Sequence, residues 1–338
     1  MSDDQRAFRV APSNETRAGA PGEASADVSA AGSPTPPVMS QLWYVFRSMR
    51  PRQWTKNLIV YIALLFSIDQ EWQLHDPDSW APLLAKSSLV FVFFCLISSA
   101  EYLVNDVVDA ESDRQHPQKR RRPIAAGLLS PQAAVVCALG MAAIGLGGGF
   151  ALQWHVGAVL SGYLVLMLAY SYVLKHLVLI DMMAIGGGFV LRAMAGALAI
   201  DVPISPWLYV VTALAALFLV IHKRRAELTL LESGAGSHRR ILDEYSADLL
   251  DQMASLVTAS TLIAYSLYTF TAENLPDNNA MMLTIPFVLY GLLRYLYLVH
   301  QKHEGGSPEE VLLSDWPLLV DILLWLGTAA TVLVIYRD

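Results

Sequence analysis

The stretch "LVFVFFCLISSAEYLVNDVVDAESDRQHPQKRRR", residues 89–122, begins as an apolar run and ends in clustered acids followed by clustered bases. A helix needs about 20 apolar residues to cross the hydrocarbon core of a bilayer, and this run with the residues before it is long enough. Ionisable side chains at membrane depth are rare and usually serve a function. The junction between apolar run and charges is therefore the first candidate site.

The composition of the whole chain agrees with a membrane protein. Of its 338 residues 54% are hydrophobic and 16% are charged, whereas soluble domains carry about 25% charged residues. We predict an all-α, polytopic membrane protein with nine transmembrane helices. The predicted spans are 54–68, 81–104, 132–152, 154–174, 178–200, 205–222, 252–272, 280–300 and 316–336.

The N-terminal segment has a different composition. Residues 1–42 are rich in Ala, Gly, Ser and Pro and contain few large apolar side chains. Such a segment buries too little surface to fold. We predict a disordered cytoplasmic tail over 1–42 and a transmembrane domain over 43–338.

The basic residues orient the spans. Lys and Arg gather in 47–56, 114–122 and 223–240, whereas the loops 69–80, 201–206 and 272–280 contain none. Because positive residues favour the cytoplasmic side, we predict a cytoplasmic N-terminus, an external C-terminus and a site that opens to the cytoplasm. The predicted location is the plasma membrane.

The acids after residue 104 suggest a metal site. If the helix continues to about Asp113, then Asp106, Asp109 and Asp113 share one face, with Asn105 pairing with Asp109 beside it. Carboxylates that face one another repel unless a cation lies between them, and Mg²⁺ takes one or two carboxylates with water and phosphate oxygens. The bases that follow would bind the phosphates. The alternative is a solvated loop in which acids and bases only pair with each other.

Three further polar clusters fall on the same predicted side. Each has a structural alternative: an internal Asp–Arg link, a positive-inside anchor, or a snorkelling lysine. Together with the acidic stretch, they favour a pocket for a Mg²⁺-bound diphosphate. Their members are Tyr172, Lys175, Asp181 and Arg192 in the first, Lys223 and Arg224 in the second, and Lys56 and Asn57 in the third.

The motif "NDVVDAESD" (105–113) resembles the N-D-x-x-D-x-x-x-D motif of the UbiA superfamily of intramembrane prenyltransferases. The resemblance covers about residues 45–336. It implies nine helices around a central cavity that opens to the cytoplasm, with Asp residues holding Mg²⁺-diphosphate.

A set of four motifs resembles one branch of that superfamily more closely, the decaprenyl-phosphate phosphoribosyltransferases. The motifs are "RPRQWTKN" (50–57), "NDVVDAESDRQHPQKRRRPIAAG" (105–127), "LKHLVLIDMMAIGGGFVLRAMAGA" (174–197) and "HKRRAEL" (222–228). The branch transfers the phosphoribosyl group of phosphoribosyl pyrophosphate to decaprenyl phosphate, for cell-wall arabinan synthesis. The resemblance also implies a homotrimer, and we predict no nucleic-acid partner. Unlike the prenyltransferases, this chain has no intact second Asp-rich motif, because Asp181 is followed four residues later by Ile185.

From the residues and the resemblance together we predict a catalytic set of Asp106, Asp109 and Lys175, with Asp106 and Asp109 as Mg²⁺ ligands. Two other activities stay open: transfer of a prenyl group from its diphosphate, and transport of a phosphorylated solute. The predicted substrate-binding residues are Lys56, Asn57, Asn105, Asp113, Lys119, Arg120, Arg122, Tyr172, Asp181, Arg192, Lys223 and Arg224.

Overall fold

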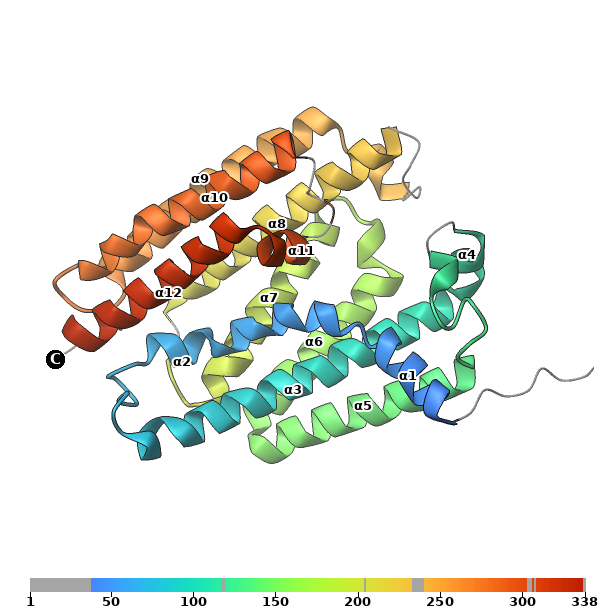
Figure 1. The fold of residues 1–338 in the computed structure, drawn as a ribbon, viewed down its shortest axis with the longest axis horizontal. Helices are drawn as coiled ribbons and strands as arrows, with labels where there is room; N and C mark the ends of the chain where they lie inside the picture. The colour runs from blue at the N-terminus through green and yellow to red at the C-terminus, as the bar shows by residue number, and fades with distance from the viewer. Residues whose placement is uncertain are drawn as a thin grey trace, which may run out of the picture. The chain divides into compact units, whose positions relative to one another are not determined.

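The computed structural model describes residues 38–116, 119–203, 205–232, 240–302, 306 and 308–336. Within these residues the regular elements are all helices, apart from one isolated bridge between Ile68 and Trp72 (Figure 1). The prediction of an all-α membrane protein is confirmed. The predicted tail up to residue 37 lies outside the described residues, and the first helix, α1 (Val38–Ser48), begins inside its predicted range.

Eight helices among the described residues are long and apolar enough to cross a membrane. The predicted number of nine is therefore not confirmed. The eight are α3 (Pro77–Val108), α5 (Pro131–Leu152), α6 (Trp154–Tyr172), α7 (Ile180–Ala199), α8 (Pro206–Glu232), α9 (Ala247–Thr271), η5 (Ala280–Thr284) continued by α10 (Ile285–Gln301), and α12 (Trp316–Tyr336).

The remaining predicted span, 54–68, forms a different kind of helix. It contains the 3₁₀ helix η1 (Pro51–Tyr61) and the short α2 (Ile62–Phe66). A 3₁₀ helix rises about 2.0 Å per residue against 1.5 Å for an α-helix, so the two elements together extend about 30 Å, close to the thickness of a hydrocarbon core. A Cβ atom on Gly196 of α7 would lie 2.1 Å from the carbonyl oxygen of Val60. Glycine at this position lets α7 approach η1 closely.

Two long helices, α3 and α5, begin at a proline that follows a capping side chain. Asp76 accepts a hydrogen bond from the Asp78 N–H before α3, and Ser130 accepts one from the Ala133 N–H before α5. A capped first turn and a proline whose missing N–H needs no partner both favour a helix start. Local sequence thus determines where these helices begin, and for α3 the start lies at Pro77 instead of the predicted 81.

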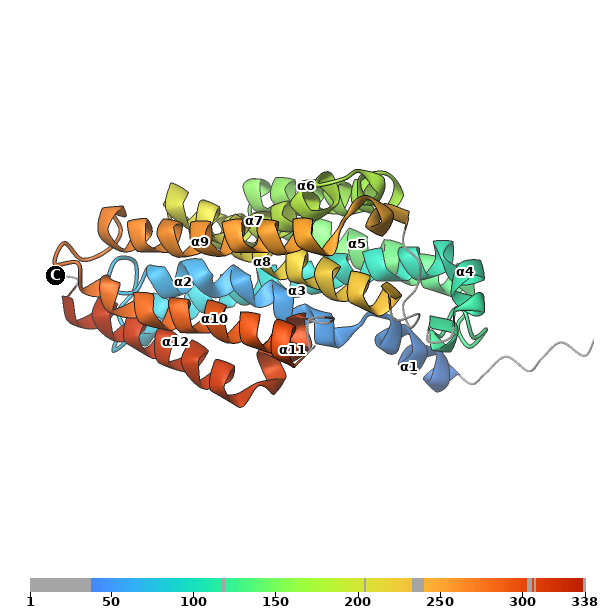
Figure 2. The ribbon, with the colours of Figure 1, turned by 90° about the horizontal axis from the view of Figure 1, so that it is seen from above.

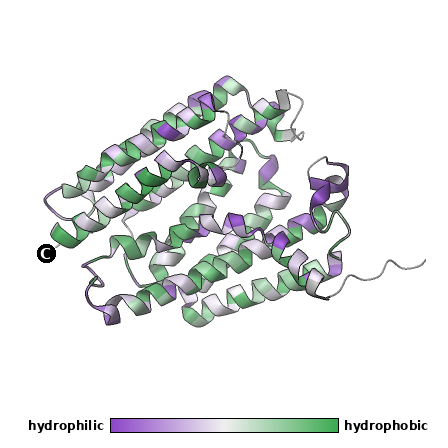
Figure 3. Cartoon of the chain, viewed as in Figure 1, coloured by the Kyte–Doolittle hydropathy of each residue, from purple (hydrophilic) through white to green (hydrophobic). Residues whose placement is uncertain are grey.

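The helices pack in two groups that meet where α7 contacts α8. Helix α3 contacts α5, α6, α7 and η1, while α8 contacts α7 and α9, and α10 contacts α12 (Figures 1 and 2). Aromatic and aliphatic side chains fill the first group, with Phe94 and Ile97 of α3 meeting Leu160 and Tyr163 of α6. Hydrophobic residues run along the long helices, and hydrophilic ones gather at α4 beyond the end of α3 (Figure 3).

Short elements surround the end of α3 or connect the long helices at their ends. They are α4 (Ala110–Gln115), η2 (Lys119–Arg121), η3 (Leu174–His176), η4 (Arg240–Glu244) and α11 (Pro308–Ser314). Helix α1 lies beside α3, where Tyr44 and Val45 pack against the cluster that includes Ala100 and Leu103. Four of the predicted site residues, Asp113, Lys119, Arg120 and Lys175, lie in these short elements.

Candidate functional site

The acids at the end of α3 converge on one arginine. The Asp106 carboxylate accepts a hydrogen bond from Arg122 Nη1 at 3.1 Å, and the Asp113 carboxylate accepts one from the same nitrogen at 2.7 Å. Both aspartates are buried, with 2% of each exposed. Two buried carboxylates that face one another need a positive charge between them, and here the guanidinium of Arg122 supplies it.

The helix carrying these acids is interrupted. Helix α3 ends at Val108, Asp109 stands at the break, and α4 begins at Ala110. The expected pairing of Asn105 with Asp109 is not present, because the Asn105 amide donates to the Glu101 carboxylate at 2.9 Å. The structure brings Asp106 together with Asp113, whereas the metal pair Asp106 and Asp109 stays a prediction.

A second arginine reaches Asp106 from a distant part of the chain. Arg50 Nη2 donates to Asp106 Oδ1 at 2.5 Å, and its guanidinium carbon lies 4.7 Å from the centre of the Tyr102 ring. Arg50 precedes η1 and has a left-handed backbone, with φ 54° and ψ 63°. Such a conformation costs a non-glycine residue about 1–2 kcal/mol. The surrounding contacts hold Arg50 in it and direct its side chain toward α3.

Arg50, Asp106 and Arg122 line an open cavity of about 560 Å³. Its wall includes a buried hydroxyl, that of Ser48, which has no hydrogen-bond partner among the described residues. Five basic side chains and a single acid give the cavity a strong positive potential. We call it the basic cavity, and its lining residues are Arg47, Ser48, Arg50, Asp106, Lys119, Arg121, Arg122 and Pro123.

The charge and lining of the basic cavity suit a diphosphate together with its bound cation. Arginine forks bind phosphate oxygens in pairs, and the unpartnered Ser48 hydroxyl offers one more donor. The described residues contain no cluster of three or more acidic, His or Cys side chains that would hold a metal alone. This suits Mg²⁺, which typically uses one or two carboxylates and completes its shell with water and substrate phosphates.

The predicted set of bases is only partly found in this cavity. Lys119 and Arg122 line it together with Arg121, whereas Arg120 does not. Arg47, Arg50 and Ser48 were missed from the sequence, because bases next to a span are expected there for orientation alone. The three arginines in "RSMRPR" (47–52) are the sequence feature that could have indicated this part of the cavity wall.

Asp181 and Arg224, which belong to two different predicted clusters, form a closed network. Asp181 accepts hydrogen bonds from Arg224 Nε at 2.9 Å and from the Tyr245 hydroxyl at 3.0 Å. Arg224 also bonds Glu227 at 2.8 Å and Tyr170 at 3.2 Å. Burial raises the pKa of Tyr245 to about 12, so its phenol keeps the proton that it donates. Asp181 and Arg224 join helices α7 and α8, and Tyr245, missed from the sequence, joins them to the segment before α9.

Arg192 is not the partner of Asp181, although both lie on α7. Its Nε donates to Asn57 Oδ1 at 2.7 Å, and its Nη2 donates to the Tyr163 hydroxyl at 2.6 Å. The Asn57 amide in turn donates to Cys95 Sγ at 3.3 Å. Eleven positions on one helix bring two side chains near the same face, but each bonds to a different neighbouring helix. Asn57 and Arg192 tie η1 to α7.

Four other predicted residues do not line the basic cavity. Tyr172 at the end of α6 is 54% exposed, and Lys175 follows it in η3. Lys223 is partly buried on α8. Lys56 bonds Gln53 within η1 at 2.5 Å. Their predicted roles stay predictions.

Comparisons with known proteins agree with this fold. The model of the UbiA prenyltransferase family matches residues 75–314. A decaprenyl-phosphate phosphoribosyltransferase of Mycolicibacterium smegmatis is 34% identical over 293 residues, which cover 84% of this chain and 90% of that protein. One of Mycobacterium tuberculosis is 34% identical, with 84% and 92% covered.

Solved structures show the same fold. A UbiA homolog from Archaeoglobus fulgidus bound to GPP and Mg²⁺ has a TM-score of 0.65 at 17% identity, covering 86% of this chain and 99% of that one. A UbiA homolog from Aeropyrum pernix has a TM-score of 0.56 at 17% identity, with 85% and 98% covered. The chain therefore belongs to the UbiA prenyltransferase family, where it stands alongside the decaprenyl-phosphate phosphoribosyltransferases.

Proposed function

We propose that the protein transfers the 5-phosphoribosyl group of phosphoribosyl pyrophosphate to a polyprenyl phosphate in the membrane, with release of pyrophosphate. The observation that carries this proposal is the identity of 34% to decaprenyl-phosphate phosphoribosyltransferases over 84% of the chain. The basic cavity supports it, because a donor with both a diphosphate and a 5-phosphate requires many cations. The product would serve cell-wall arabinan synthesis.

The reaction forms one bond and breaks one. An oxygen of the acceptor phosphate bonds to the anomeric carbon of the ribose, and the bond from that carbon to pyrophosphate breaks, with its electron pair leaving on the pyrophosphate oxygen. The acceptor oxygen is already anionic, so no general base is needed. The main demand is to stabilise negative charge on the leaving group.

The residues of the basic cavity would divide this task. Arg50, Lys119 and Arg122 would hold the donor phosphates. Asp106 and Asp109, with Asp113 in support, would hold Mg²⁺, which would neutralise negative charge on the leaving pyrophosphate. Ser48 would donate to a phosphate oxygen. The anionic acceptor must also approach an anionic donor, and Lys56, Lys175 and Lys223 are proposed to offset that repulsion. Arg192 and Arg224 are hydrogen-bonded to other side chains in the structure. They would hold the helices around the site in position.

The placement in the membrane follows the charge pattern. We propose that the basic cavity opens to the cytoplasm, that the N-terminus is cytoplasmic and the C-terminus external, and that the acceptor's polyprenyl chain lies along apolar helix faces open to lipid. The homotrimer also stays a prediction, and sedimentation velocity in detergent would test it.

A donor assay tests the proposed activity. Purified protein would be given polyprenyl phosphate and Mg²⁺ with labelled phosphoribosyl pyrophosphate, or an aromatic or lipid acceptor with labelled geranyl diphosphate. We expect label from phosphoribosyl pyrophosphate to move into the lipid and pyrophosphate to be released. Transfer from geranyl diphosphate alone would instead assign a prenyltransferase, and Mg²⁺-dependent release of pyrophosphate in detergent would exclude simple transport.

A further inference from the structure

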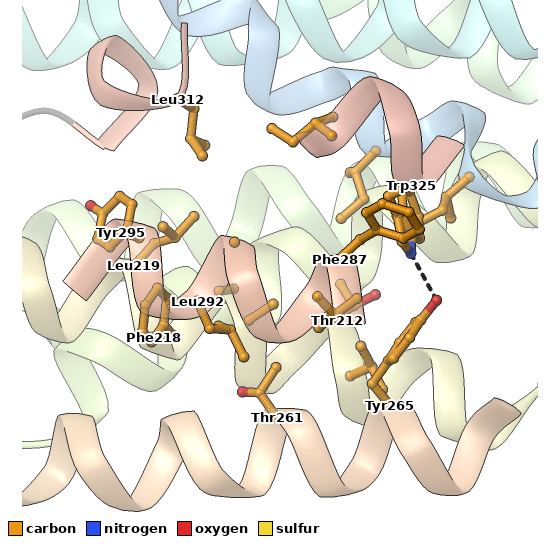
Figure 4. A pocket seen from close by; sticks show the side chains of 18 of the residues that line it. Thr212, Phe218, Leu219, Thr261, Tyr265, Phe287, Leu292, Tyr295, Leu312 and Trp325 are labelled. Carbon is orange, nitrogen blue, oxygen red and sulfur yellow. Dashed lines mark hydrogen bonds between the residues drawn. The ribbon is translucent and has the colours of Figure 1, made fainter. Parts of the chain in front are cut away.

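A second cavity lies among the membrane-spanning helices and shares no lining residue with the basic cavity. Its volume of about 340 Å³ is at the lower end of the range for small-molecule sites. Leu312 and Tyr295 mark one end and Trp325 and Tyr265 the other, with Thr212 and Thr261 between (Figure 4). Its walls come from η1 and α2, from α7 to α11, and from α12, and they are mostly apolar. We call it the apolar cavity.

One acidic side chain lines the apolar cavity. Asp321 of α12 is 8% exposed. Among the residues that the structure describes, none forms a hydrogen bond or an ion pair with its carboxyl group. A Cβ atom added to Gly291 of α10 would lie 3.0 Å from Asp321 Oδ2, so glycine leaves room for the carboxyl group at the wall.

Two other hydroxyl groups of the wall, those of Tyr265 and Thr261, have hydrogen-bond partners. The Tyr265 hydroxyl bonds Thr284 at 2.6 Å and accepts from Trp325 Nε1 at 2.7 Å. The Thr261 hydroxyl donates to the Val257 carbonyl oxygen at 2.7 Å. Asp321 differs from these groups, since burying an unpaired carboxyl group in apolar surroundings is costly and such groups inside a membrane usually serve a function.

An isoprenoid chain offers Asp321 no hydrogen-bond donor, so hydrocarbon alone does not suit this wall. We propose that the apolar cavity is a separate binding site for a lipophilic molecule with one hydrogen-bond-donating head group, a hydroxyl or an ammonium, which Asp321 receives. The apolar wall holds the body of the ligand, and the carboxyl group fixes its orientation. The site does not depend on the proposed transferase activity, because no residue is shared with the basic cavity.

Photolabelling tests this site without an activity assay. Protein in lipid nanodiscs would be irradiated with diazirine-bearing decan-1-ol, decylamine or decane, and the labelled peptides of α8 and α10 would be measured by mass spectrometry. A hydrogen bond to a charged group contributes about 1.5 kcal/mol or more, which corresponds to about tenfold in occupancy. We expect the alcohol, the amine or both to label the cavity peptides about tenfold more than decane does.

Three variants assign the effect to the carboxyl group. Asp321→Leu should reduce labelling by the donor probe to the level of decane. Asp321→Asn keeps an acceptor without charge, so it should retain labelling by an alcohol and lose labelling by an amine. Thr212→Val removes a hydroxyl from the same wall and should change labelling less than about twofold, because the charged partner remains.

Two results would overturn the proposal. Equal labelling by decane and by both donor probes in the unaltered protein would make the cavity a hydrocarbon site, such as one for the polyprenyl chain. Unchanged labelling in Asp321→Leu would show that the carboxyl group does not take part in binding the ligand. If the leucine variant does not purify as a monodisperse protein, Asp321→Ala takes its place, and labelling by a donor probe that stays above the level of decane in that variant counts against the site.

Discussion

Two buried aspartates in this protein accept hydrogen bonds from arginine, but their surroundings differ. Asp106 bonds Arg50 and Arg122, whose side chains are 33% and 27% exposed and line the basic cavity. Asp181 bonds Arg224, and the two are 0% and 2% exposed. An arginine at a cavity wall can exchange its carboxylate for a phosphate, whereas one enclosed by protein cannot. The same pair of residue types is therefore a candidate site in one place and a structural link in the other.

We expect the largest effect on activity, from a substitution of Asp106. Asp106→Asn keeps the shape of the side chain and removes the charge that would hold Mg²⁺ and position Arg50 and Arg122. We expect pyrophosphate release to fall on the order of 10³-fold, as for loss of a group that stabilises developing charge, while the protein still purifies normally. Near-normal Mg²⁺-dependent release in this variant would contradict the assignment of Asp106.

We expect the next largest effect on stability, from a substitution of Asp181. Asp181→Asn leaves the enclosed Arg224 with one carboxylate fewer, and breaking a buried pair costs about 3 kcal/mol or more. We expect the free energy of unfolding in detergent to fall by about this amount. Asp251→Asn is the matched control, because Asp251 bonds Arg225 at 3.1 Å but is 39% exposed, and exposed pairs contribute at most about 1 kcal/mol. An equal loss of unfolding free energy in both variants would show that the enclosed network stabilises the protein no more than a surface ion pair does.

A smaller effect tests the arginine that only the tertiary structure revealed. Arg50→Gln removes one donor to the phosphates, so we expect the KM for phosphoribosyl pyrophosphate to rise about tenfold, equivalent to one charge-assisted hydrogen bond. Arg52→Gln serves as control, since Arg52 is 88% exposed and its partner Glu310 lies 3.6 Å away at the surface. The cavity assignment would fail if both variants had the same KM.

The smallest effect tests a single hydroxyl. Ser48→Ala removes the unpartnered donor of the basic cavity, and we expect a rise in KM of about threefold, the lower range for a neutral hydrogen bond. Ser87→Ala removes another buried hydroxyl without a partner among the described residues, on α3 and outside the cavity lining. A steady-state comparison that finds the same KM for both variants would exclude Ser48 from phosphate binding.

The sequence by itself determined the all-α membrane class, the approximate position of most helices, and the importance of the stretch from Asn105 to Arg122. Hydrophobic run length, proline starts and charge at a span end are local signals, and each constrains a single segment. The "NDVVDAESD" motif (105–113) added the family, because its residue types and spacing are specific.

The partners of these residues were decided only by the tertiary structure. Arg50 reaches Asp106 across 56 positions, Arg224 reaches Asp181 across 43, and Arg192 reaches Asn57 across 135. Periodicity places a side chain on a helix face but does not say which neighbouring helix that face meets. Packing around Gly196 and the 3₁₀ geometry of η1 bring those faces together, and with them the charges that distinguish the site at Asp106 from the closed network at Asp181.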